Sequence, residues 1–117
     1  MRIIGNNPAA ENAEITAVAS GALANGDAVI VNSDGTVSVV GGGNLTSENF
    51  IGFANGAAAD TGKAKVDIGC AINGAQSGLT AGQTYYVQTD GTLGLTAADP
   101  SVIAGTAISA TEIIVKG

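Results

Sequence analysis

The chain has 117 residues, enough for one domain, and it carries a net charge of −6 with only four basic residues. Four cations are too few for a phosphate-binding face, and no apolar run approaches the roughly 20 residues of a membrane-spanning helix, so we expect neither nucleic acid nor a membrane as partner. The absence of His and the single Cys exclude a His-activated nucleophile, a zinc cluster and an internal disulfide, so we expect no enzyme and no cofactor.

Residues 1–13 lack a strand pattern, and we predict that they form an extended N-terminal arm. Ile3 and Ile4 would be its apolar anchors, and Pro8 favours an extended backbone after them. Two interpretations stay open, an arm that a neighbouring molecule orders or a frayed terminus. The segment has no long apolar stretch of the signal-peptide type, which predicts synthesis in the cytoplasm without excluding an extracellular destination.

A single β domain is predicted over residues 14–117, beginning with a strand near 14–20, and it contains an internal repeat. Residues 21–37 read GALANGDAVIVNSDGTV and residues 77–93 read SGLTAGQTYYVQTDGTL. A shift of 56 positions therefore places one Asp-Gly-Thr sequence on the other. Each copy continues through a further pair of strands, which extends the repeat to about 21–69 and 77–117.

Strand and turn signals occur at matching places in the two copies. A β-branched or aromatic run precedes an Asp-Gly pair in each, and Asp-Gly is a strong hairpin signal because both residues tolerate positive φ. The expected strands are 28–31, 50–54 and 63–68 in the first copy, and 84–87, 103–107 and 111–116 in the second. These patterns predict an all-β fold, a small β-sandwich or barrel built from two sequence-related halves.

The core of such a domain should be thin. Gly and Ala make up about a third of the chain, and neither buries much apolar area. Small proteins with thin cores usually gain stability from disulfides, metals or partner subunits. Because the composition excludes the first two, we expect a homo-oligomer.

The aromatic residues are candidates both for the core and for an interface. Tyr85 and Tyr86 are adjacent on one predicted strand and point to opposite faces, so one of them should face outward. Cys70 is expected to be a small buried hydrophobic residue rather than a reactive thiol. The interface candidates are Ile3, Ile4, Phe50, Phe53, Tyr85 and Tyr86.

The second copy of the repeat, residues 77–93, resembles a module of tailed-phage structural proteins, especially those of cyanophages and other marine phages. Residues 102–111 (VIAGTAISAT) resemble the closing segment of the same module. Upstream, GDAV at 26–29 and IGFA at 51–54 are similar to the G-D-x-V and I-G-x-A pattern of capsid cement proteins. The resemblance covers residues 14–117 and brings no catalytic, cofactor-binding or metal-binding residue with it.

This resemblance implies a virion protein at the capsid surface. A capsid decoration, or cement, protein would bind the major capsid protein on the outer surface of the phage head and stabilise it, with a trimer as the favoured assembly. The alternative is the terminal domain of a tail fibre or head fibre that takes part in host attachment. A chain that opens with its own Met1 and a short arm, with no repetitive shaft before the module, favours the decoration protein.

Overall fold

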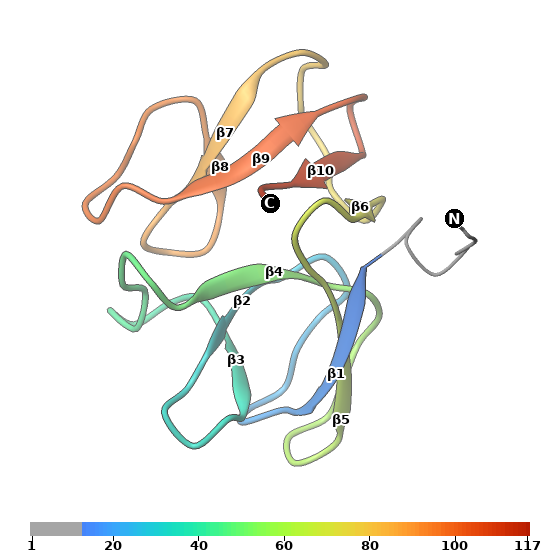
Figure 1. Ribbon diagram of the computed structural model, residues 1–117, viewed down its shortest axis with the longest axis vertical. Helices are drawn as coiled ribbons and strands as arrows, with labels where there is room; N and C mark the ends of the chain where they lie inside the picture. Colours follow the sequence, from blue (N-terminus) through green and yellow to red (C-terminus); the bar gives the residue numbers. More distant parts are fainter. Residues whose placement is uncertain (1–12) are drawn as a thin grey trace.

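The fold is all-β, as the sequence predicted. Figure 1 shows the protein as a computed structural model, which describes residues 13–117. This part of the chain contains ten strands in two antiparallel five-stranded sheets and no helix. The strands of the first sheet are β1 (Glu14–Val18), β2 (Ala28–Val31), β3 (Val37–Val39), β4 (Phe50–Ala54) and β5 (Lys63–Asp67). Those of the second are β6 (Ile72–Asn73), β7 (Thr84–Val87), β8 (Leu93–Gly94), β9 (Ile103–Ala107) and β10 (Ile113–Val115).

The two sheets have the same topology. Their strand orders are β1-β5-β4-β2-β3 and β6-β10-β9-β7-β8, so each strand of the first sheet has a counterpart five strands later. The register also shifts at the same place in each sheet, because one residue is left unpaired in a β-bulge, Ile51 of β4 opposite Val29 and Ile30, and Ala104 of β9 opposite Tyr85 and Tyr86. The sequence repeat thus corresponds to two copies of one fold within the chain.

The Asp-Gly hairpins make the same hydrogen bonds in both halves. The backbone N–H and the hydroxyl of Thr36 donate to Asp34 Oδ1 at 3.0 and 2.6 Å, and Thr92 donates to Asp90 Oδ1 at the same distances. Of each Asp-Gly pair only the glycine has a positive φ, 86° at Gly35, whereas the sequence argument allowed it for both residues. A type I turn followed by a left-handed glycine explains the difference, because the Asp keeps a negative φ there.

The first sheet curls until its two edges meet. Ala19, just beyond β1, forms a parallel bridge with Val37 of β3, and the N–H of Ser20 donates to the Val37 carbonyl at 2.7 Å. The side chains inside this small barrel are mostly small or β-branched, and its buried members are Ala19, Leu23, Val29, Val37, Ala54, Ala64 and Val66. The first half therefore has an interior of its own.

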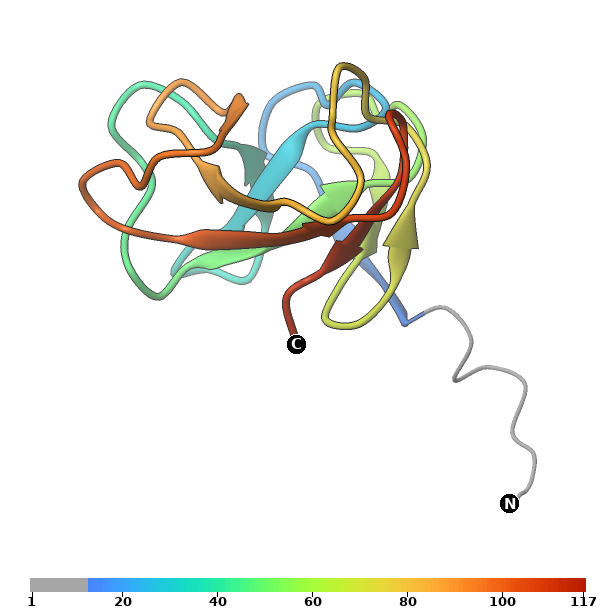
Figure 2. The ribbon, with the colours of Figure 1, turned by 90° about the horizontal axis from the view of Figure 1, so that it is seen from above.

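A second buried cluster joins the two halves. The outer face of β2 and β4 contributes Ala28, Ile30 and Phe53, each at most 2% exposed. The second sheet covers this face with the side chains of Tyr85, Val87, Ala104, Ala107, Ile113 and Val115. In Figure 2 the strands β7 and β9 accordingly lie over β2 and β4. The interior of the second half is thus completed by the outside of the first.

A buried polar network closes the joint between the halves. Asn73 of β6, only 1% exposed, donates from Nδ2 to Asp67 Oδ2 at 2.9 Å and to the Ala54 carbonyl at 3.1 Å. Its Oδ1 accepts from the N–H of Ala75 at 3.1 Å and from Gln76 Nε2 at 2.9 Å. Four hydrogen bonds use the full capacity of the amide, which therefore fixes the start of the second half against the end of the first.

Two glycines sit where neighbouring backbones come closest. A Cβ built on Gly52 of β4 would lie 1.8 Å from the Asp67 carbonyl oxygen. At the equivalent position in the second half, a Cβ on Gly105 would lie 2.0 Å from the Ile114 carbonyl oxygen. No side chain fits in such a space, so both halves require glycine next to their bulges.

Candidate interaction surface

The predicted interface residues of the first half differ in accessibility. Phe53 is 1% exposed and belongs to the core between the halves. Phe50 is half-buried beside it, with the ring centroids 5.5 Å apart and the ring planes at 72°. Ile3 and Ile4 lie outside the described residues. Of this group only Phe50 retains a partly accessible side chain in the described part of the chain.

Tyr85 and Tyr86 point to opposite faces of β7, as predicted. Tyr85 is the inward residue, 6% exposed, and its hydroxyl accepts a hydrogen bond from the N–H of Thr80 at 2.9 Å. Tyr86 is half-buried on the other face, opposite Ile103 of β9 and Gly94 of β8. The outward tyrosine is therefore Tyr86, and its role in an interface stays a prediction.

Cys70 corrects an expectation, because its side chain is exposed rather than buried. The residue has a positive φ of 70° in the turn between β5 and β6, where the N–H of Ala71 donates to the Ile68 carbonyl at 2.9 Å. Its own N–H donates to the Val115 carbonyl at 2.8 Å. The backbone is thus held by the turn, and the left-handed conformation directs the thiol outward.

The outer face of the second sheet presents a set of isoleucines that the sequence argument did not single out. Ile72, Ile114 and Thr106 are direct neighbours across β6, β10 and β9, and the row continues to Thr84 of β7. The next pair on the face is Ile103 and Tyr86. We call these six residues the isoleucine face: Ile72, Thr84, Tyr86, Ile103, Thr106 and Ile114.

The isoleucines of this face are unusually accessible for their size. Ile72, Ile103 and Ile114 are 42, 39 and 38% exposed, and an apolar groove of about 330 Å³ runs beside the last two. One signal for the face was present in the sequence. Adjacent Ile113 and Ile114 in one strand must point to opposite sides, so one of them had to face outward.

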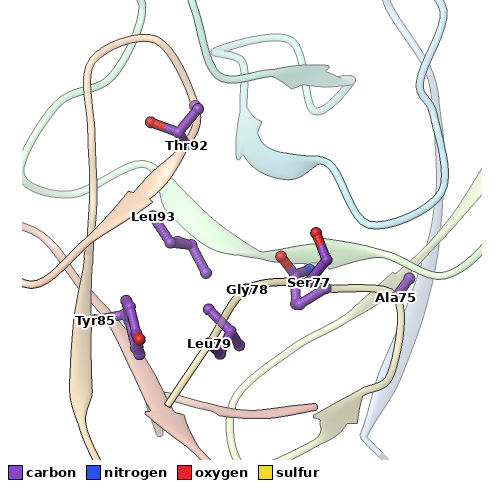
Figure 3. A pocket seen from close by; sticks show the side chains of 9 residues that line it. Ala75, Ser77, Gly78, Leu79, Tyr85, Thr92 and Leu93 are labelled. Atoms are coloured by element: carbon purple, nitrogen blue, oxygen red, sulfur yellow. The ribbon is translucent and has the colours of Figure 1, made fainter. Parts of the chain in front are cut away.

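A second hollow lies at the open seam of the second half. Its volume is about 250 Å³. Figure 3 shows Ser77, Leu79 and Tyr85 on one side of it and Thr92 and Leu93 on the other. The hydroxyl of Tyr85 is already engaged by a backbone N–H. The lining offers small polar groups and backbone but no acidic or basic side chain.

Two exposed acidic side chains, Asp34 and Asp90, stabilise the hairpin turns. The Thr36 hydroxyl and N–H hold the pKa of Asp34 below its usual value, and Thr92 lowers the pKa of Asp90 in the same way. Within residues 13–117, no three Asp, Glu or Cys side chains gather into a group that could hold a metal ion.

Comparisons of the chain with protein-family models, with curated proteins and with solved structures gave no match. In the described part of the chain no helix is long and apolar enough to cross a membrane.

Proposed function

We propose that the protein is a structural component of a phage particle, a capsid decoration protein that binds the major capsid protein on the outer surface of the head. The observation that carries the proposal is the resemblance of residues 77–93 to a tailed-phage structural module. Its hairpin, built on Asp90 and Thr92, recurs in the first half with the same hydrogen bonds. Residues 13–117 therefore contain two copies of the fold to which this hairpin belongs.

The described surface suits a protein that acts by contact. Charged residues are 12% of the chain, and within residues 13–117 nine large hydrophobic side chains are exposed, three of them on the isoleucine face. Exposed apolar groups on a sheet face favour association with another protein. A decoration protein needs no more than such contacts, because its function is to bridge subunits that are already assembled.

Self-association belongs to the same proposal. The buried side chains of both clusters are mainly Ala, Val and Leu, and their aromatic members are Phe53 and Tyr85. Burial of such side chains yields less stabilisation than burial of large aromatics. We expect a homo-oligomer on the capsid, with a trimer favoured at three-fold positions.

The experiment that tests the function is quantitative mass spectrometry of purified particles of the phage that encodes the chain. A decoration protein should be present in hundreds of copies per particle, and density for it should lie on the outside of the head. A few copies at the tail or at a single vertex would support the fibre domain instead. Absence from purified particles would refute both.

The N-terminal arm can be tested on the same particles. Protein lacking residues 1–13 is added to capsids stripped of the native protein, and its binding is compared with that of the full chain. A second variant, Ile3→Asp with Ile4→Asp, removes the apolar anchors without shortening the chain. If the arm anchors the protein, both variants should fold normally but bind far more weakly. If both bind like the full chain, the arm takes no part in attachment.

A further inference from the structure

The isoleucine face has a counterpart in the first half, and the two differ in one respect. Strand pairing makes Phe53 the counterpart of Thr106 and Phe50 the counterpart of Ile103, since each pair occupies the same register beside the bulge. Phe53 is buried against the second half, whereas its counterpart Thr106 is exposed, and Ile30 is 1% exposed, whereas its counterpart Tyr86 is half-buried. The same face of the same fold is therefore covered in one half and uncovered in the other.

The chain itself shows what kind of surface covers this face. In the first half the cover is a β-sheet of the same fold, which places small and branched side chains such as Val87, Ala104 and Val115 on Ile30 and Phe53. Leu45 and Leu79, from the loops before β4 and β7, complete the cluster together with Val40 and Val102 at strand ends. No helix or charged side chain contributes to it in the described part of the chain. The interface between the halves thus joins one module to another through their sheet faces.

The charge distribution allows the isoleucine face to approach another copy of the chain. The chain carries a net charge of −6, so two copies repel each other over most of their surface. The six residues of the isoleucine face include no acid, and the charged residue that lines its groove is Lys116. Two copies of this acidic protein can therefore approach each other at the isoleucine face without repulsion between carboxylates of that face.

We propose that the isoleucine face is the surface through which a second copy of this chain binds. The inference deepens the proposed function, on which it rests for the expectation that copies associate, and it names the surface. A two-fold axis would set the face against itself, and a three-fold axis would set it against another surface of the next copy. In either arrangement Ile103 and Ile114 become buried at the contact between copies.

The test compares two double variants by sedimentation velocity under reducing conditions, from about 1 µM to 1 mM. Ile103→Thr with Ile114→Thr removes apolar area from the face but keeps β-branched side chains. Val31→Thr with Val39→Thr is the matched control, because these valines are 37 and 38% exposed on the first sheet. We expect the isoleucine variant to associate at least about tenfold more weakly than the native chain, and the control to associate like the native chain.

Cys70 provides a second measurement that needs no substitution. The thiol is exposed and lines the same groove as Ile103 and Ile114, so association should slow its alkylation by iodoacetamide as the protein concentration rises. This measurement decides the matter if the isoleucine variant does not fold. Alkylation that stays equally fast while the native chain associates would place the contact elsewhere and overturn the proposal.

Two further results would overturn the inference, a native chain that stays monomeric at 1 mM and a native chain whose association is unchanged by the isoleucine substitutions. The proposed function fails on different grounds, namely absence of the protein from purified particles. A protein that occurs in hundreds of copies per head yet self-associates through another surface would refute the inference alone.

Discussion

Asn73 offers the sharpest test of how the two halves are held together. Its amide makes four hydrogen bonds in a site that is 1% exposed, and Asn73→Ala removes them all. At about 1 kcal/mol for each net hydrogen bond, the loss is about 4 kcal/mol. Asp67 also loses one of its hydrogen-bond partners. Because Asp67 is only 2% exposed, water has little access to replace that hydrogen bond. We expect the free energy of unfolding to fall by about 3–4 kcal/mol.

The assay is urea unfolding followed by circular dichroism, together with the melting temperature, at a fixed protein concentration. For a domain of this size 1 kcal/mol corresponds to roughly 4 °C, so the melting temperature should fall by about 12 °C or more. Asn32→Ala is the control, because that amide bonds only Thr36 and Ser38 within one hairpin and is partly accessible. We expect the control to cost about 1 kcal/mol. Equal losses for the two variants would refute the idea that the network stabilises the joint.

Two further substitutions test the local geometry. Gly105→Ala places a Cβ 2.0 Å from the Ile114 carbonyl oxygen, whereas at Gly56, where φ is also positive, a Cβ would meet no atom within 4 Å. We expect Gly105→Ala to lower the free energy of unfolding by at least about 1–3 kcal/mol more than Gly56→Ala. Equal urea midpoints for the two variants would contradict this. The Thr36 hydrogen bonds lower the pKa of Asp34 from 3.8, so their stabilisation is present above that pH and is lost as the pH falls through the lower folded value. Asp34→Asn should therefore lower stability at pH 6 and flatten its decline toward pH 2, and melting curves with an unchanged acid decline would contradict the assignment.

The parts of the fold that depend on neighbouring residues were predictable from the sequence. The Asp-Gly hairpins were recognisable because turn conformation is set by two or three adjacent residues. The strand 63–68 was recognisable from its strict polar–apolar alternation, and it appears as Lys63–Asp67. The repeat then added long-range information, because similar sequences at a shift of 56 implied the same topology in the two halves.

The parts that depend on which face is covered were not predictable. Alternation assigns residues to one side of a strand, but it does not say which side another sheet will cover. Val29 and Ile30 are therefore both fully buried on opposite faces of β2, whereas the equivalent Tyr85 is buried and Tyr86 only half-buried. The exposure of Cys70 was also not predictable, because it depends on a left-handed turn conformation that directs this small side chain outward.

The difference between the halves follows from how the inside of each is filled. The first barrel closes through the bridge between Ala19 and Val37 because small side chains fill its interior. The second sheet takes up Ile30 and Phe53 of the first half instead, and at its matching seam a hollow separates Ser77 from Leu93. Two copies of one fold thus occupy unequal environments, one closed and covered, the other open and with Ile103 and Ile114 of its outer face exposed. The duplication therefore creates, in the second half, an uncovered copy of the surface through which the first half is bound.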